Sequence, residues 1–330
     1  MIESIEFRNF MALRAATLPL GRFTLIVGPN GSGKTTALSA FGLIQNPRQR
    51  SNRQVRSTTA PASANATLTV NWTEEGYKGT VAVFWPHAGH PEGPIFSSLP
   101  EHLIGPRGTL NRARLFSFEA SAIAAPVLLE PHLELAQDGA NLAGVLDRLR
   151  DQFPERFEAL NEELGRWIPE FDRVLFETPK QGHRAICLRT RVGGHTIGAD
   201  ELSQGTLIAL ALLTLAYAPE PPSIVCLEEP DRGLHPRLLR DVRDALYRLA
   251  HPEGAGETRS PVQVIATTHN PYFLDLFREH PEEIVIAEKA GLDATFSRLS
   301  DRSDLEEILG DAPLSEVWYS GVLGGVPAGT

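Results

Sequence analysis

The stretch GPNGSGKT, residues Gly28–Thr35, is the most informative segment of this 330-residue chain. It satisfies the pattern G-x-x-x-x-G-K-[S/T], in which glycines let the backbone curl so that successive N–H groups face phosphates. The apolar run Phe23–Val27 before it indicates a strand buried on both sides, and Thr35–Leu43 continues as a helix. Strand, glycine-rich loop and helix predict a nucleotide site. The alternative is a glycine turn with a surface lysine.

The residues of this loop have separate predicted roles. Lys34 supplies a positive charge to the β- and γ-phosphates, and the Thr35 hydroxyl is a ligand for Mg²⁺. The helix that follows adds the positive end of its dipole. The sequence therefore predicts ATP and Mg²⁺ as ligands. The predicted nucleotide-binding residues here are Gly28, Pro29, Asn30, Gly31, Ser32, Gly33, Lys34, Thr35 and Thr36.

A second apolar strand ends in two acids, in SIVCLEEP (Ser223–Pro230). Glu228 is predicted on the metal side, with its contact to Mg²⁺ through a coordinated water, because glutamate replaces the shorter aspartate that is usual there. Glu229 is the predicted catalytic residue that polarises the attacking water. The alternative is a pair of solvated acids at the end of a strand.

A third apolar strand ends in ATTHNP (Ala266–Pro271). At the tip of a strand beside the other two loops, a neutral His269 can donate a hydrogen bond to the γ-phosphate and sense its presence. A lone histidine is also often a structural residue, and this alternative stays open. The strand context favours a role in the nucleotide site.

The segment LSQGT (Leu202–Thr206) stands about twenty residues before the acidic pair and begins a predicted helix. Ser203 suits the N-cap position, and Gly205 permits a close approach of backbone. The start of such a helix can hold an anion. The chain thus carries a second phosphate-binding helix start beside a single glycine-rich loop.

This order of elements resembles the ABC-type ATPases, in which such a signature helix completes the site of the opposite subunit. The resemblance implies a head-to-tail homodimer that encloses two ATP molecules, with Asp231 contacting the partner. Within this class the chain resembles the RecF/SMC/OLD-like branch, and more narrowly the stand-alone AAA-21-type ATPases. The segments that carry the narrower resemblance are DGANLAGVLDRLR (138–150), PERFEALNEEL (154–164), EEPDRGLHP (228–236) and LSEVWYSGVLGG (314–325).

The opening IESIEFRNF is similar to the first strand of that branch, where a basic residue approaches the nucleotide. The resemblance implies that Arg8 and Asn9 take these positions. Three features depart from the branch. Only about sixty residues follow His269, too few for the Toprim domain of OLD nucleases, and no long coiled coil separates the loop from the signature segment. The glutamine that ABC proteins place near Mg²⁺ has no clear counterpart among Gln45, Gln137 and Gln152.

The expected fold is an α/β ABC-type head with a mixed sheet, an N-terminal antiparallel β portion and a helical lobe that carries the signature segment. We expect one head over residues 1–330. Its nucleotide-binding core comprises 1–44 and 220–330, a β-rich and loop insert covers 45–135, and the helical lobe covers 136–219.

The overall charge does not indicate binding to nucleic acid or to a membrane surface, because the formal net charge is −10. Residues 45–66 nevertheless hold four arginines and no acid. They are predicted to form a flexible solvated loop or, alternatively, a loop that contacts phosphates or nucleic acid. The start of the chain has no signal-peptide pattern, and the most apolar stretch, Leu207–Ala218, is too short to span a bilayer. We expect a soluble, cytoplasmic protein.

These features together predict an ATP-hydrolysing switch that dimerises on ATP. The resemblance suggests DNA repair, chromosome maintenance or anti-phage defence, with a separate nuclease or effector as a partner and DNA as a further candidate. A nucleotide-gated binding module with negligible turnover is one alternative, and a transporter-type ABC subunit is another. A GTPase is disfavoured because no NKxD-type loop is found. A P-loop kinase is disfavoured because kinases lack counterparts of Ser203 and His269.

Overall fold

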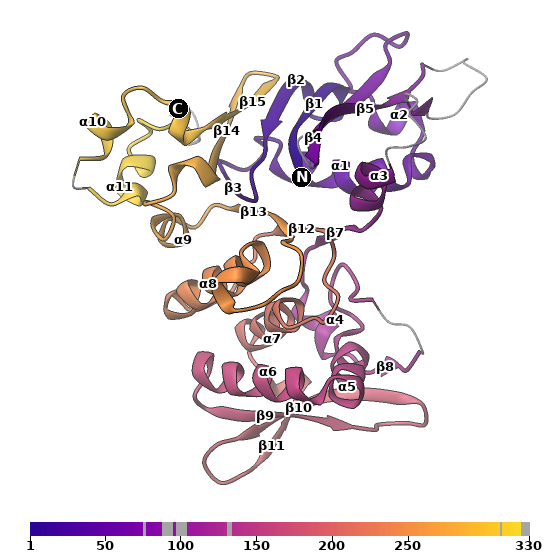
Figure 1. The fold of residues 1–330 in the computed structure, drawn as a ribbon, viewed down its shortest axis with the longest axis vertical. Helices are drawn as coiled ribbons and strands as arrows, with labels where there is room; N and C mark the ends of the chain where they lie inside the picture. Colours follow the sequence, from indigo (N-terminus) through magenta and orange to yellow (C-terminus); the bar gives the residue numbers. More distant parts are fainter. Residues whose placement is uncertain (75–76, 88–94, 97–103, 131–133, 311, 325–330) are drawn as a thin grey trace. The chain divides into compact units, whose positions relative to one another are not determined.

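The computed structural model describes residues 1–74, 77–87, 95–96, 104–130, 134–310 and 312–324 (Figure 1). The chain folds into two compact units. Unit 1 comprises Met1–Leu115, Pro222–Glu228 and Pro261–Thr330. Unit 2 comprises Phe116–Pro221 and Glu229–Ser260.

Unit 1 is built on a six-stranded sheet in the order β15-β14-β3-β13-β12-β7. The neighbours β12, β13, β3 and β14 pair in parallel, and β15 pairs antiparallel with β14. Every residue of β3 and β13 is buried. This agrees with their apolar runs, which have no polar face. The strand bounds are β3 Phe23–Val27, β7 Ala113–Phe116, β12 Ile224–Glu228, β13 Gln263–Thr268, β14 Ile284–Ala290 and β15 Asp293–Arg298.

A second sheet of unit 1 is antiparallel, in the order β2-β1-β4-β5-β6, as predicted for the N-terminal portion. Its alternating apolar residues, such as Ile5 and Phe7, point into a core that also contains Phe41 of helix α1 (Lys34–Gln45) and Ile265 of β13. Helix α1 therefore packs in the core shared by the two sheets. The strands are β1 Ile2–Phe10, β2 Leu13–Pro19, β4 Ala66–Glu74, β5 Tyr77–Trp85 and β6 Ile95–Phe96.

The arginine-containing segment after α1 is more ordered than the predicted loop. It forms a 3₁₀ turn, η1 (Pro47–Gln49), and a short helix, α2 (Asn52–Val55). Ser51 and Gln54 form a capping box around α2, and Val55 is fully buried. These local hydrogen bonds and one apolar anchor outweigh the polar composition on which the loop prediction was based. Residues 88–94 and 97–103 of the predicted insert lie outside the described residues, and α3 (Ile104–Asn111) follows them.

The C-terminal part of unit 1 adds short helices after the strands. These are α9 Pro271–Asp275, η5 Pro281–Glu283, η6 Leu299–Asp301, α10 Leu305–Leu309 and α11 Leu314–Tyr319. Helix α11 packs beside α9, and Ser315 donates a hydrogen bond to Asp275 (2.5 Å).

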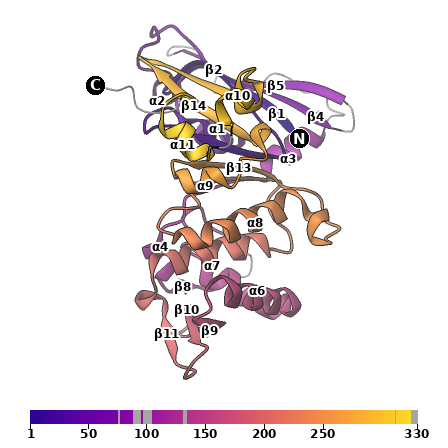
Figure 2. The same cartoon turned by 90° about the vertical axis from the view of Figure 1, so that its left-hand side faces the viewer.

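Unit 2 contains the signature segment on helix α7 (Gln204–Ala216). Every residue of α7 from Thr206 to Ala216 is buried, and α8 (Leu239–Ala250) packs alongside it (Figure 2). Strand β10 (His183–Thr190) belongs to an antiparallel sheet, which the prediction of a helical lobe over 136–219 did not include. Its partners are β8 Val127–Leu128, β9 Phe171–Glu177 and β11 Thr196–Gly198. The other helical segments of unit 2 are α4 Ala120–Ala124, α5 Leu142–Gln152, α6 Pro154–Trp167, η2 Ala199–Glu201, η3 Pro236–Leu238 and η4 Pro252–Ala255.

Among the described residues, no helix has both the length and the apolar character that crossing a bilayer requires.

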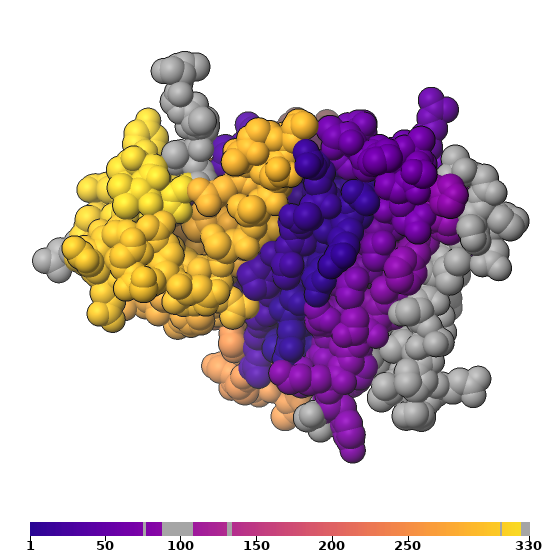
Figure 3. All heavy atoms as spheres, turned by 90° about the horizontal axis from the view of Figure 1, so that it is seen from above, coloured from indigo at the N-terminus to yellow at the C-terminus, as the bar shows by residue number. Residues whose placement is uncertain are grey.

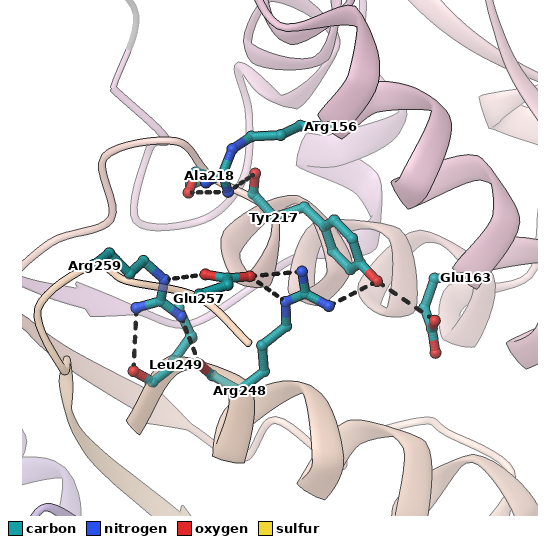
Figure 4. A network of polar contacts seen from close by, with 8 residues as sticks. All are labelled: Arg156, Glu163, Tyr217, Ala218, Arg248, Leu249, Glu257 and Arg259. Carbon is teal, nitrogen blue, oxygen red and sulfur yellow. Dashed lines mark hydrogen bonds and ion pairs between the residues drawn. The ribbon is translucent and has the colours of Figure 1, made fainter. Parts of the chain in front are cut away.

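A polar network centred on Glu257 joins the helices of unit 2 (Figure 4). Arg248 donates to one carboxylate oxygen of Glu257 (2.8 Å) and Arg259 to the other (2.5 Å). The Arg248 guanidinium also lies 4.2 Å from the ring centroid of Tyr217, at the end of α7. The Tyr217 hydroxyl makes a long hydrogen bond to Glu163 of α6 (3.4 Å). The network therefore ties the end of the signature helix to α6 and α8.

Partial burial opposes ionisation of Glu257, but the hydrogen bond from Arg259 and the charge of Arg248 outweigh it. The pKa of the Glu257 carboxyl therefore lies below its ordinary value of 4.5. Because the folded-state pKa is lowered, the carboxylate stabilises the fold above about pH 4.5, and this contribution is lost as pH falls through the lowered pKa.

We expect Glu257→Gln to reduce the free energy of unfolding at pH 7 by about 1–3 kcal/mol, since it weakens two charge-assisted hydrogen bonds. The difference from the wild type should shrink below pH 4.5. Urea unfolding from pH 7 down to pH 3 measures both effects. The exposed Glu253→Gln is the matched control and should change little. A Glu257→Gln difference that stays constant with pH would contradict this account.

Candidate nucleotide-binding site

Three strand ends meet at one edge of the six-stranded sheet. Strand β13 lies between β3 and β12 and is parallel to both. In this register Thr268 pairs with Val27, and Thr267 pairs with Glu228. The glycine-rich loop, His269 and the acidic pair therefore each begin within a residue or two of the same sheet edge. This is the edge at which open parallel sheets bind ligands.

The glycines of the loop Gly28–Thr35 are required by its geometry. Gly31 and Gly33 have φ angles of +79° and +96°, in the left-handed region that favours glycine. A Cβ atom on Gly28 would lie 2.2 Å from the carbonyl oxygen of Ala287 in β14. The loop is therefore held tightly against the sheet, and its curl is fixed by backbone rather than by side chains.

Two side chains of the loop are placed to meet an anion. The Lys34 ammonium donates to the carbonyl oxygens of Gly28 (2.6 Å) and Pro29 (2.9 Å) and is 8% exposed. The Ser32 hydroxyl is buried and has no hydrogen-bond partner among the described residues. A buried hydroxyl without a partner is costly, and phosphate oxygens would satisfy it. These groups fit a polyphosphate in the curl of the loop.

The two residues predicted to face Mg²⁺ lie in contact. The Thr35 hydroxyl, at the start of α1, donates a hydrogen bond to a carboxylate oxygen of Glu228, at the end of β12. One hydroxyl and one carboxylate suit Mg²⁺, which takes few protein ligands when phosphates and water complete its shell. The donor set therefore fits a magnesium ion bound together with a triphosphate.

Glu229 has an unusual backbone. Its φ angle is +48°, in the left-handed region that a glutamate rarely adopts. Such a conformation costs of order 1–3 kcal/mol and persists only where the surrounding structure enforces it, often at functional sites. Nothing in the sequence LEEP signals this strain. Asn9 (φ +52°) and Met11 (φ +46°) are the other non-glycine residues in this region among those described.

His269 is presented at the sheet edge by local hydrogen bonds around it. The Asn270 N–H donates to the Thr268 hydroxyl (3.0 Å), and the Asn270 side chain accepts from the Tyr272 N–H (3.0 Å). This second bond caps the start of α9. The His269 side chain is exposed, directly after the last residue of β13. It can therefore reach a ligand at the edge.

Arg8 and Asn9 lie on β1 and line an open groove of about 550 Å³ between β1, β2 and β15. In Figure 3 the first two strands (indigo) run beside the C-terminal strands (orange) on this face of unit 1. A Cβ atom on Gly33 would lie 2.6 Å from Leu13 of β2, so the glycine-rich loop is next to the hairpin that forms the groove. Asn9 also donates to the carbonyl of Asn65 (3.1 Å).

The signature segment belongs to unit 2. As predicted, Ser203 is the N-cap of α7, and its hydroxyl accepts from the Thr206 N–H (3.1 Å). Ser203 is exposed. The close approach that Gly205 permits is to backbone of the same unit, since a Cβ there would lie 2.9 Å from the Gly233 carbonyl oxygen. Asp231, in the same segment as Gly233, is buried at 6% exposure.

Of the glutamines considered for Mg²⁺, Gln45 is engaged within the fold. At the end of α1 its amide donates to the carbonyls of Leu110 (2.9 Å) and Ala113. This contact joins α1 to the start of β7.

Two protein families match the chain. Residues 94–275 match the family described as "AAA domain, putative AbiEii toxin, Type IV TA system", and residues 1–77 match an "AAA ATPase domain". The first match spans more than half of the chain. The chain belongs to this AAA family. The predicted membership of an AAA-21-type family is thereby confirmed.

Individual relatives are more distant. An OLD nuclease from Thermus scotoductus (strain ATCC 700910 / SA-01) is 23% identical over 357 residues, with 93% of this chain and 66% of the nuclease aligned. The chain thus spans slightly less than two thirds of that protein. The SMC head domain from Thermotoga maritima has a TM-score of 0.53 at 17% identity, covering 90% of this chain and 98% of that one. This likeness confirms the predicted ABC-type head fold. A structure of the recombination mediator protein RecF has a TM-score of 0.47 at 10% identity, covering 90% of this chain and 98% of that one. We draw no argument from a similarity at this level.

We expect Gly28→Ala to lower the free energy of unfolding by about 1–3 kcal/mol, because the new Cβ meets rigid backbone, and to weaken ATP binding. Gly42→Ala, within α1, is the control. No atom lies within 4 Å of its Cβ, and alanine in a helix should add about 0.5–1 kcal/mol. Urea unfolding and titration with a fluorescent ATP analogue measure both. Equal stability of the two variants would count against a tightly packed loop.

Proposed function

We propose that this chain is an ATP-binding and ATP-hydrolysing molecular switch. The observation that carries the proposal is the meeting of the Lys34 loop, the Thr35–Glu228 contact and His269 at the ends of three adjacent parallel strands. Membership in an AAA ATPase family supports it. Both units are then parts of one ATPase head, with the predicted core at 1–44 and 220–330, insert at 45–135 and lobe at 136–219.

Binding begins with the glycine-rich loop. The Lys34 ammonium exchanges the carbonyls of Gly28 and Pro29 for the β- and γ-phosphates, and Ser32 gains a partner for its buried hydroxyl. Thr35 and Glu228 hold the magnesium site, Glu228 through a coordinated water. Mg²⁺, when bound, neutralises charge on the phosphates. These residues do their work by position and charge, because phosphoryl transfer needs little covalent chemistry from the protein.

Hydrolysis requires a group that orients water. Glu229 directly follows Glu228, and its left-handed backbone conformation is of the kind that is found at functional sites. In the proposed step, the Glu229 carboxylate accepts a hydrogen bond from the attacking water and then its proton. His269 donates a hydrogen bond to a γ-phosphate oxygen. Loss of that oxygen on hydrolysis removes the bond, so β13 senses whether the γ-phosphate is present.

The switch works as a dimer in this proposal. Ser203 and Gly205 at the exposed start of α7 contact the γ-phosphate bound by the partner subunit, where the positive end of the helix dipole favours an anion. The likeness of fold to an SMC head domain supports this arrangement. Arg8 and Asn9 contact the nucleotide from the groove beside the loop.

The proposed task is DNA repair, chromosome maintenance or anti-phage defence, together with a separate nuclease or effector. The OLD nuclease relative supports a connection with nucleic acids. The alternative, a nucleotide-gated binding module, differs from the switch in having no turnover.

We expect Glu229→Gln to reduce ATP turnover by about 10²–10⁴-fold, the usual contribution of a general base, while ATP-bound dimers accumulate. Phosphate release gives the turnover, and light scattering coupled to size-exclusion chromatography gives the mass with ATP. The neighbouring exposed Glu220→Gln is the control and should keep full turnover. If the wild type itself shows no turnover while still binding ATP, the protein is a binding module.

A composite site can be tested by mixing two inactive variants. Lys34→Ala lacks a working loop, and Ser203→Arg blocks the signature helix. In a mixed dimer the Ser203→Arg loop meets an intact partner Ser203, so one of the two sites is restored. Random pairing then predicts recovery of roughly a quarter of wild-type ATPase, because half of the dimers are mixed. No recovery on mixing, while light scattering shows that the mixed dimer forms in the presence of ATP, would refute completion of the site by the partner.

A further inference from the structure

The segment between α1 and β4 carries an unusual concentration of unpaired positive charge. Arg48, Arg50 and Arg53 are exposed, and no hydrogen bond or ion pair joins any of them to the described residues. Residues 45–66 contain no acid. In a chain of net charge −10 this is a local exception. Several arginines elsewhere do have a carboxylate partner, as in the pairs of the half-buried Arg173 with Glu158 and the half-buried Arg302 with Asp304.

The backbone of the segment that carries these three arginines is held in place by buried residues and hydrogen bonds. Val55 is fully buried, and its carbonyl accepts from the Met11 N–H (2.6 Å). Pro47 is buried, and its carbonyl accepts from the Trp85 indole N–H (2.9 Å). Asn52 donates to the Trp85 carbonyl (2.6 Å). The backbone that carries the arginines is therefore tied to the antiparallel sheet, which lowers the entropy lost when a ligand binds.

We infer that Arg48, Arg50 and Arg53 form a contact surface for the phosphate backbone of double-stranded DNA. Guanidinium groups match phosphate geometry and carry a permanent charge. The positive arginines attract the negative phosphates of DNA. Because the chain as a whole has a net negative charge, we expect this attraction to be limited to the arginine surface. This inference does not depend on the ATP site, because none of the three residues belongs to it.

The same segment disfavours other anionic partners. It contains no aromatic residue on which unpaired bases could stack, as single-strand binders require. None of the exposed large apolar side chains lies in it, so nothing is available to insert into a lipid bilayer. Duplex DNA, whose outer surface is its phosphate backbone, fits these features best.

The contact should be independent of sequence. Bases are read by side-chain amides and guanidinium groups in the grooves, whereas phosphate contacts position the duplex without reading it. The two amide side chains of α2 are already engaged, Asn52 with Trp85 and Gln54 with Ser51. With these amides engaged, we expect the three guanidinium groups to contact phosphates rather than to read bases.

The test uses the full chain without nucleotide and a fluorescein-labelled DNA duplex of mixed sequence, titrated by anisotropy between 50 and 200 mM KCl. The variant is Arg48→Glu, Arg50→Glu, Arg53→Glu. The control is Arg237→Glu, Arg240→Glu, Lys289→Glu, which changes the net charge equally at exposed positions elsewhere. We expect the variant to bind at least tenfold more weakly and to lose about one unit of salt slope per arginine. The control should keep most of the affinity and the full slope.

A milder triple change of the same arginines to glutamine should shift affinity and slope in the same direction, with the thermal melting temperature unchanged. Equal weakening in variant and control would overturn the inference in favour of bulk charge. So would unchanged binding in the variant, or a preference above about tenfold between two unrelated duplexes, since phosphate contacts cannot read sequence. Tighter binding to phosphatidylserine vesicles or to a polyglutamate peptide than to DNA would likewise overturn it.

Discussion

The position of β13 between β3 and β12 is the constraint on which the candidate site depends. Because all three strands are parallel and in register at their carboxyl ends, the segments that follow them emerge at one edge. The glycine-rich loop, the acidic pair and the segment that contains His269 are thereby brought together, although almost two hundred residues separate Lys34 from Glu228. The Thr35–Glu228 hydrogen bond is the most direct sign of this meeting. A different strand order would leave each segment a solvated turn.

The shape of the site is also set by its backbone conformation rather than by flexible side chains. Gly28 has no room for a Cβ, Gly31 and Gly33 curl the loop, and Glu229 keeps a left-handed conformation that glutamate disfavours. Such strain must be offset by favourable packing elsewhere in the fold. In unit 2, the network around Glu257 fixes the end of α7 whose other end carries Ser203. Rigid placement suits chemistry that depends on position and charge.

The sequence predicted the elements whose signals are local. Strand β3, helix α1 and the Ser203 cap follow from apolar runs and capping residues, and the structure contains all three. Features that depend on distant partners were not predictable: β9 and β11 form around β10, and Gly205 packs on Gly233. The prediction of a loop over 47–55 was wrong, because one buried valine and a capping box order this segment. The backbone strain at Glu229 could not be predicted, because a glutamate at this position gives no sign of a left-handed conformation.

Hydrogen–deuterium exchange with and without ATP and Mg²⁺ tests whether the three strand ends form one nucleotide site. We predict slower exchange on ATP addition in the three peptides that contain residues 28–36, 224–229 and 266–271, because one ligand contacts all three strand ends. Lys34→Ala should abolish the change in all three at once. Protection confined to one of these peptides, or located elsewhere in the chain, would show that the strand ends do not form a common nucleotide site.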